Sequence, residues 1–235
     1  MNPKNLIHNL MFMLFVLLVF PTTSCNKNDG PIFTQGQPVT DIEGNVYNTI
    51  KINNQVWMAE NLKTKTFNNG ELIETTVPFN KDLSNESSPK YVWSYDGNED
   101  YKSVYGLLYT WYAATDNRKV CPAGWHVPTD AEWTSLTEFL GGDSIAGGKL
   151  KESGTTHYLG PNIGATNESG FTALPSGHRY VWGAFEAMGD GPVWWSATEY
   201  NFDNAWFRSL GHSNKGVRRD YYPKNDGMAI RCIKD

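Results

Sequence analysis

The hydrophobic pattern of this chain is clearest over residues 120–140, where a strand pattern gives way to a helical one. The strand pattern at residues 125–127 is interrupted by Pro128. The apolar positions that follow recur every three or four residues, and two glycines at 141–142 favour termination. This spacing predicts a helix that ends at residue 140 and buries the face formed by Trp133, Leu136, Thr137 and Leu140.

Polar residues mark the start of this helix. Thr129 can accept a hydrogen bond from a backbone N–H of the first turn, and Glu132 can bond back to the amide of Thr129, which is a capping box. Asp130 adds a negative charge where the helix dipole is positive. We therefore expect Glu132 to act as a cap, Trp133 as a core residue, and His126 as a strand residue with a satisfied ring.

Short strand patterns occupy much of the remaining chain. Asn53 and Asn54 predict a tight hairpin between the first two strands. Apolar residues at helical spacing predict a second helix over residues 105–115. Strands are expected at residues 47–52, 55–58, 91–95, 170–177, 192–199, 205–210 and 227–233, with the entry into a further short strand at 147–151.

Two main helices among many short, mostly antiparallel strands predict an α+β domain. The other segments are expected to be irregular, with a long surface excursion at residues 61–89, a loop at 155–166 and a small, flexible segment at 183–191. With 22 Gly and 12 Pro punctuating it, the chain is typical of one turn-rich domain of roughly 200 residues.

The first 24 residues have the pattern of an export signal. Lys4 is their only charged residue, and the apolar run over residues 10–20 is too short to span a bilayer. The sequence PTTSC that ends at Cys25 resembles a lipobox, in which the cysteine becomes lipidated. We expect residues 1–24 to be a lipoprotein signal peptide, residues 25–37 a flexible tether and residues 38–235 the folded domain. An ordinary secretory signal with an incidental cysteine is the alternative.

Lipidation of Cys25 would anchor the protein to a membrane of the cell envelope. The outer membrane is the expected location, and the sequence does not indicate on which side. Without the signal peptide the chain keeps 19 of its 20 Lys and Arg against 25 Asp and Glu, a net charge of −6. Nucleic acid is not expected as a partner, because no basic run is present to displace counterions from phosphates.

Cys121 and Cys232 remain once Cys25 is lipidated. An even remainder in an exported protein predicts a disulfide. The bond would close a loop of roughly 100 residues, for which the chain-entropy model gives a stabilisation of about 4–5 kcal/mol. Two buried free thiols are the alternative.

Oxygen-bearing side chains at Asp96, Asn98 and Asp100 alternate as they do at the start of calcium-binding loops. Tyr101 stands where an EF-hand has Gly, and Leu107 where it has Glu, so this is no EF-hand. A solvated loop is the favoured interpretation, and calcium is the ion expected if one binds.

Other chemistry-bearing patterns are missing from the sequence. The histidines at 126, 157, 178 and 212 are too far apart in sequence for a local zinc motif. No nucleophile elbow, P-loop or dinucleotide fingerprint is present. We therefore expect no catalytic residues, and no cofactor other than calcium.

Six motifs follow one another along the chain: VYNTIKINNQVWMAENLKT, YGLLYTWYAA, CPAGWHVPTDAEWTSL, GFTALPSGHR, WWSATE and GMAIRCIKD. In this order they resemble the Fibrobacter succinogenes major paralogous domain family. The resemblance covers residues 39–235. It implies an exported or surface protein, often a lipoprotein, whose C-terminal half has the C-type-lectin-like fold shared with formylglycine-generating enzymes.

In that fold the helix around Glu132 packs against a closing strand at residues 227–232. The resemblance places Cys121 and Cys232 in a structural bridge, so the copper-binding cysteine pair of formylglycine-generating enzymes is not expected. The Glu-Pro-Asn, Gln-Pro-Asp and Trp-Asn-Asp motifs of calcium-dependent lectins do not occur in the sequence.

The family has no established activity, and we expect a non-catalytic module that binds glycan or protein. A structural component of the cell envelope without a small ligand is the alternative. Residues 179–219 correspond to the variable loop region of the lectin-like fold and offer aromatic faces for a sugar. Trp195 and Trp206 are assigned to the core because they lie inside strand patterns. The predicted ligand-binding residues are Tyr180, Trp182, Trp194, Tyr200 and Arg208.

Overall fold

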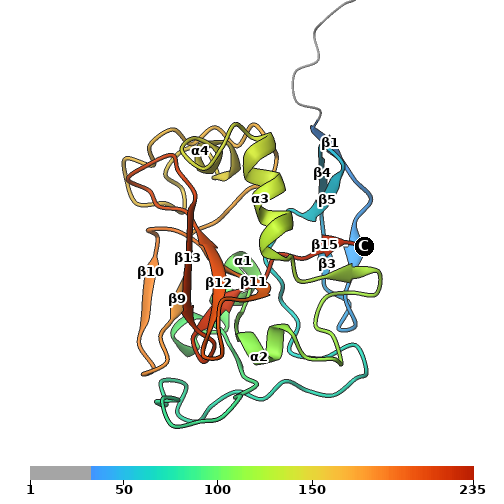
Figure 1. Cartoon of the computed structure of the whole chain (residues 1–235), viewed down its shortest axis with the longest axis vertical. Helices are drawn as coiled ribbons and strands as arrows, with labels where there is room; N and C mark the ends of the chain where they lie inside the picture. Colours follow the sequence, from blue (N-terminus) through green and yellow to red (C-terminus); the bar gives the residue numbers. More distant parts are fainter. Residues whose placement is uncertain (1–32) are drawn as a thin grey trace, which may run out of the picture. The chain divides into compact units, whose positions relative to one another are not determined.

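The computed structural model describes residues 33–235, which form two principal β-sheets with helix α3 (Asp130–Phe139) packed against both (Figure 1). The predicted signal peptide and Cys25 lie outside the described residues. Within residues 33–235 no helix is long and apolar enough to cross a membrane. The shorter helical elements are η1 (Tyr95–Gly97), α1 (Asp100–Tyr105), α2 (Trp111–Ala114) and α4 (Ala146–Leu150).

The smaller sheet has the strand order β1-β4-β5-β15-β8 and is antiparallel throughout. Asn53, with a φ of 56°, turns the chain between β4 and β5, where the sequence predicts a hairpin. A separate ribbon pairs β2 (Val39–Thr40) with β3 (Val46–Tyr47). The strands of the smaller sheet are β1 (Phe33–Gln35), β4 (Thr49–Ile52), β5 (Gln55–Met58), β8 (Trp125–His126) and β15 (Ile233–Lys234).

The larger sheet has the order β10-β9-β14-β11-β12-β13, with β7 beside β14 and β6 beside β7. Its pairings are antiparallel except that of β11 with β14. The predicted α+β class with mostly antiparallel strands is thus confirmed. The strands are β6 (Val92–Trp93), β7 (Leu108–Thr110), β9 (Ser176–Arg179), β10 (Phe185–Met188), β11 (Val193–Glu199), β12 (Asn204–Ser209), β13 (Arg218–Pro223) and β14 (Gly227–Ala229).

Helix α3 has the predicted cap and the predicted buried face. Glu132 N donates to Thr129 Oγ1 at 3.2 Å, and Thr129 N donates to Glu132 Oε2 at 2.7 Å. Trp133 packs against Trp57 of β5 and Trp194 of β11, with ring centroids 4.7 and 5.4 Å apart. These contacts join the two sheets through one side chain of the helix.

The last strands of the chain belong to different sheets. β14 pairs with β7, β9 and β11, whereas β15 pairs with β5 and β8. Cys232 lies between them and forms the predicted disulfide with Cys121, 111 positions earlier in the chain. The alternative of two free thiols is therefore wrong.

Two predicted elements have the wrong type. Residues 108–110 form β7 rather than the first half of a helix, because a continuous apolar run also fits a strand that is buried on both faces. Helix is limited there to α2, so the expected second main helix is absent from the described residues. Residues 147–150 are helical rather than a strand entry, and Lys151, which follows the helix, pairs with Ala173 in an isolated parallel bridge. In α4, Gly147 and Gly148 approach the carbonyl oxygens of Gly216 and Gly164 so closely that a side chain would collide.

Three stretches are more ordered than expected. Phe33–Gln35, in the predicted tether, pairs with β4, and Phe33 packs against Phe139 at 6.4 Å. The segment 61–89 sends apolar side chains into the core and is not a simple surface excursion. The segment 183–191, expected to be flexible, contains β10. The predicted strand at 170–177 is wrong over most of its length, since β9 begins at Ser176.

Replacing both Cys121 and Cys232 with Ser is expected to lower the free energy of unfolding by about 4–5 kcal/mol, because the bond restrains a long loop of the unfolded chain. Denaturant unfolding followed by tryptophan fluorescence measures the change. The single variant Cys121→Ser is the control, since it removes the same restraint and should lose nearly as much. Equal unfolding midpoints for the wild type and the double variant would contradict this expectation.

His126 lies between two carboxylates, with Nε2 2.9 Å from Glu132 Oε1 and Nδ1 2.6 Å from Asp235 Oδ1. Burial by itself lowers the pKa of His126, but the hydrogen bonds to both carboxylates outweigh burial and raise the pKa above 6.5. Burial raises the pKa of Glu132, and the hydrogen bonds from Thr129 and His126 more than offset it and lower the pKa below 4.5.

The stabilisation from His126 should therefore be complete below pH 6.5 and be lost as the pH rises through the raised pKa. That from Glu132 is present above pH 4.5 and is lost as the pH falls through the lowered pKa. We expect His126→Gln to reduce the free energy of unfolding more at about pH 5.5 than at about pH 8.5, measured by denaturant titration. His212→Gln controls for the loss of an imidazole. A loss that is the same at both pH values would argue against the pairing.

Candidate functional site

Two of the predicted ligand-binding residues form an exposed aromatic stack. Tyr180 and Trp182 lie in the turn between β9 and β10, with ring centroids 4.1 Å apart and an interplanar angle of 11°. Trp182 is 54% exposed, whereas Tyr180 is half-buried. This turn therefore presents a flat aromatic face to solvent.

Tyr200 forms a second stack at the end of the β11–β12 hairpin. Its ring lies 3.8 Å from that of Tyr221, at an angle of 5°, and both side chains are exposed. Trp206, which the strand pattern assigned to the core, is only partly buried and meets Tyr200 edge-on at 4.9 Å. Tyr221 was not among the predicted site residues; it lies on β13, an edge strand of the larger sheet in which every residue is exposed or partly buried.

Trp194 and Arg208 do not lie at the surface as expected of a ligand face, because both side chains are buried. Trp194 lies on an inner strand of the larger sheet, and its Nε1 donates to Asn61 Oδ1 at 2.8 Å. Arg208 Nη1 donates to Asp130 Oδ1 at 2.7 Å and so fastens β12 to the start of α3. Burial raises the pKa of Asp130, but hydrogen bonds from Arg219 and Arg208 outweigh it and lower the pKa. Trp195 is buried as predicted.

A polar cavity of about 390 Å³ is lined by residues that neighbour the two stacks in sequence, and we call it the serine cavity. Val181, which separates Tyr180 from Trp182, lines it together with Phe202, which follows Tyr200 by two positions. Phe202 is 87% exposed. The remaining lining residues are Ser84, Glu86, Ser87, Ser88, Tyr112, Asp203, Pro223 and Asn225.

Hydrogen bonds of Asp226, which is buried, and Asn225, which is partly buried, hold the walls of the serine cavity. Val181 N donates to Asp226 Oδ1 at 2.7 Å, and burial raises the pKa of Asp226 to about 7. Asn225 Nδ2 donates to the carbonyl oxygens of Leu83 and Glu86, each at 3.0 Å. The lining residues Ser84, Ser87 and Ser88 belong to the stretch 61–89, which was predicted to be a surface excursion. The contacts of Asn225 with this stretch span about 140 positions and leave no local signal in the sequence.

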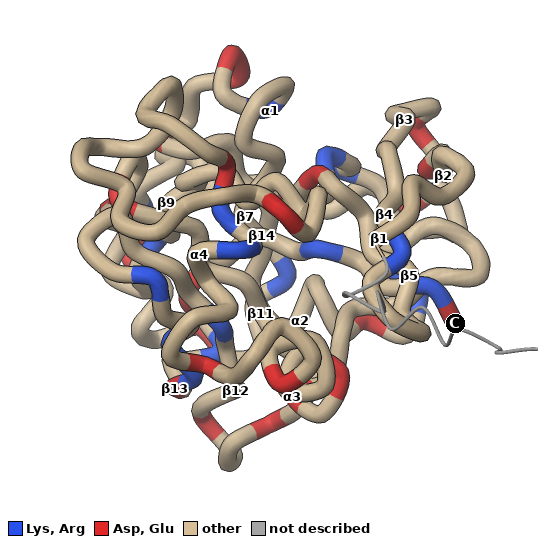
Figure 2. The backbone as a smooth tube through the Cα atoms, turned by 90° about the horizontal axis from the view of Figure 1, so that it is seen from above, with Lys and Arg blue, Asp and Glu red and all other residues tan. Residues whose placement is uncertain are grey.

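The candidate calcium ligands Asp96, Asn98 and Asp100 are all exposed. Asn98 Oδ1 accepts a hydrogen bond from Asp100 N at 3.0 Å, which is the geometry of an ordinary polar turn. Across residues 33–235 no three or more His, Cys, Asp or Glu side chains are grouped as metal ligands. Calcium binding at this loop stays a prediction. Figure 2 shows Lys and Arg interspersed with Asp and Glu in the described part of the chain.

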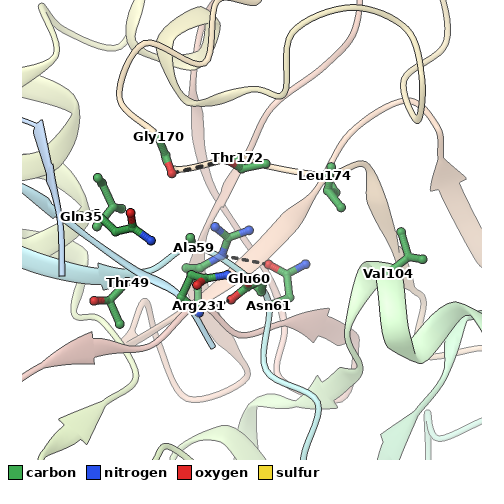
Figure 3. Close-up of a pocket in the computed structure, with 12 residues that line it drawn as sticks. Gln35, Thr49, Ala59, Glu60, Asn61, Val104, Gly170, Thr172, Leu174 and Arg231 are labelled. Atoms are coloured by element: carbon green, nitrogen blue, oxygen red, sulfur yellow. Dashed lines mark hydrogen bonds between the residues drawn. The ribbon is translucent and has the colours of Figure 1, made fainter. Parts of the chain in front are cut away.

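A second cavity, of about 420 Å³, lies beside β4 and the end of β5, and we call it the arginine pocket (Figure 3). Arg231 is 1% exposed and lines its floor. Its Nε donates to Asn61 Oδ1 at 3.1 Å, and its Nη1 donates to the carbonyl oxygens of Phe171 and Met58. The other lining residues are Gln35, Asn48, Thr49, Ile50, Ala59, Glu60, Val104, Gly170, Thr172 and Leu174.

Burial lowers the pKa of Arg231 to about 9, and through-space attraction to Glu60 opposes that shift. Nothing in the sequence indicates this pocket, because Arg231 belongs to the motif of the closing strand. Its partners come from segments about 60 and 170 positions earlier in the chain.

A sequence profile of the Fibrobacter succinogenes major domain matches residues 50–234. No curated protein sequence and no solved structure matches the chain. The matched region runs from β4 to β15 and so includes the capped helix, the disulfide and both cavities except for Gln35, Asn48 and Thr49. The chain therefore belongs to the Fibrobacter succinogenes major domain family.

Proposed function

We propose that this protein is a non-catalytic module that binds glycans at the serine cavity. The observation that carries the proposal is the exposed stack of Tyr180 on Trp182, whose intervening residue Val181 lines a polar cavity together with the exposed Phe202. Aromatic faces combine a large apolar contact area with specific geometry, and hydroxyl, amide and carboxylate groups nearby fix the orientation of a polar ligand. Sugars present both an apolar face and many hydroxyl groups, so this combination suits them.

The domain is proposed to be non-catalytic and C-type-lectin-like. Both of its cysteines are joined in the Cys121–Cys232 disulfide, so no cysteine pair remains in the domain for copper chemistry of the formylglycine-generating type. The packing of the capped helix near the closing strands supports the lectin-like assignment. In this arrangement the aromatic turns correspond to the variable loop region that the family resemblance implies.

We further propose that the protein is exported and anchored through a lipid on Cys25, in the outer membrane of the cell envelope. The support is the export pattern of residues 1–24 and the lipobox-like sequence that ends at Cys25. A disulfide within the domain suits an oxidising compartment outside the cytosol. The anchor would hold the glycan-binding module at a membrane surface.

The variant Cys25→Ser is expected to move the protein from the membrane fraction to the soluble fraction, because the acyl chains are attached to the thiol. Expression of the full chain in a bacterial host that processes lipoproteins, followed by fractionation and mass spectrometry of the N-terminal peptide, measures this. Asn26→Ser is the matched control and should remain membrane-bound. Recovery of the wild-type chain without acyl chains would rule out the anchor.

Screening the full chain on a glycan array should identify at least one bound saccharide. Trp182→Ala and Phe202→Ala should each weaken its binding about three- to tenfold, because each removes an exposed aromatic contact. Leu72→Ala, which removes an exposed apolar side chain outside the serine cavity, should bind like the wild type. Repeating the screen with calcium and with chelator tests the loop at Asp96.

The absence of any bound saccharide in both conditions would refute glycan binding and favour the structural role in the cell envelope. Binding that survives both aromatic substitutions would place the glycan elsewhere. Circular dichroism of each variant confirms that the fold is retained, which is expected because both side chains are exposed.

A further inference from the structure

The arginine pocket contains two side chains of opposite charge, Arg231 and Glu60, that do not form an ion pair with each other. Arg231 uses Nε and Nη1 for protein oxygens, and no hydrogen bond from its Nη2 is found among residues 33–235. Glu60 accepts hydrogen bonds from the backbone N and the side-chain Nδ2 of Asn48, both at 2.8 Å. In the described part of the chain neither charge forms an ion pair, although Glu60 influences Arg231 through space.

An unpaired guanidinium on the floor of a cavity is a strong binding group for an anion. Arg231 is held in place by three hydrogen bonds and by the rings of Phe171 and Trp194, whose centroids lie 4.4 and 5.6 Å from its Cζ atom. Little side-chain freedom is therefore left to lose on binding. Nη2 remains available to donate a charge-assisted hydrogen bond to a carboxylate oxygen.

The rest of the lining defines the other parts of a ligand. Glu60 would repel a simple anion but attract an ammonium group on the same molecule. Ile50, Val104 and Leu174 supply apolar walls, and Thr172 supplies a hydroxyl. The volume of about 420 Å³ lies in the range of small-molecule pockets, which is about 300–1,000 Å³.

We propose that the arginine pocket binds a free aliphatic α-amino acid, whose carboxylate accepts hydrogen bonds from Arg231 Nη2 and whose ammonium group faces Glu60 (Figure 3). Val104, which is 40% exposed on α1, stands at the edge of the pocket and contacts the aliphatic side chain. This site is independent of glycan binding at the serine cavity, with which it shares no lining residue.

Isothermal titration calorimetry of the full chain with L-leucine, L-valine and L-isoleucine tests the site. At least one of the three should bind saturably. For the tightest one, the N-acetyl derivative lacks the ammonium and the amide derivative lacks the carboxylate, and each should bind at least tenfold more weakly. No saturable binding of any of the three, or equal binding of the parent and both derivatives, would overturn the proposal.

Substitutions assign the two charges. Glu60→Gln should weaken binding of the amino acid at least tenfold while leaving the N-acetyl derivative unaffected, and Val104→Trp should weaken both by narrowing the pocket. Glu138→Gln, on the exposed side of α3, is the matched control and should bind normally. Normal binding by both pocket variants would locate the amino acid outside this pocket.

Arg231→Lys keeps a positive charge but removes the guanidinium and should abolish the preference for the carboxylate over the amide. Because Arg231 also supports the core, circular dichroism must show that this variant is folded. The Glu60 and Val104 variants keep the proposal testable if it is not. Trp182→Ala should leave amino-acid binding unchanged, which separates this test from that of the glycan proposal.

Discussion

The fold depends on one constraint, which is that the eight residues from Gly227 to Lys234 must complete two sheets at once. β14 is an inner strand of the larger sheet, and β15 lies between β5 and β8 in the smaller one. The conformation of the residues between these strands is restrained, because Cys232 forms a disulfide with Cys121 and the Arg231 guanidinium donates hydrogen bonds to three protein oxygens. The relative placement of the two sheets follows from this short connection.

Buried cations organise the irregular parts of the protein. Lys151 donates to three carbonyl oxygens from two separate loops, and burial lowers its pKa to about 8. Arg179 likewise donates to the carbonyls of residues 79 and 81 in the long polar segment. These side chains satisfy backbone oxygens that no strand or helix pairs, which would otherwise be costly to bury. A chain with short elements and long loops can thereby keep a dense core.

The same arrangement determines which chemistry reaches the surface. Lys151 and Arg179 donate their hydrogen bonds to backbone carbonyl oxygens of the scaffold, whereas Nη2 of Arg231 forms no hydrogen bond within residues 33–235 and is available to the arginine pocket. Aromatic side chains likewise fall into two groups, one in the core and one at the surface. Those on inner strands, such as Trp194, fill the core, and those in turns, such as Trp182, face solvent. The two cavities therefore offer different ligand chemistry, with aromatic and hydroxyl groups in one and an arginine and a glutamate that do not pair with each other in the other.

The sequence by itself determined the features that depend on neighbouring residues, which are the capping box of α3, the hairpin at Asn53 and the α+β class. It also determined the disulfide, because only two cysteines remain in the domain to form one. Tertiary structure alone decided whether residues 108–110 became strand or helix, because their uniform apolarity suits either one. It also decided that Trp194 is core and Tyr221 is surface, since exposure depends on which strands flank a residue. Both cavities also depend on the tertiary structure, because their walls come from segments that are distant in the sequence.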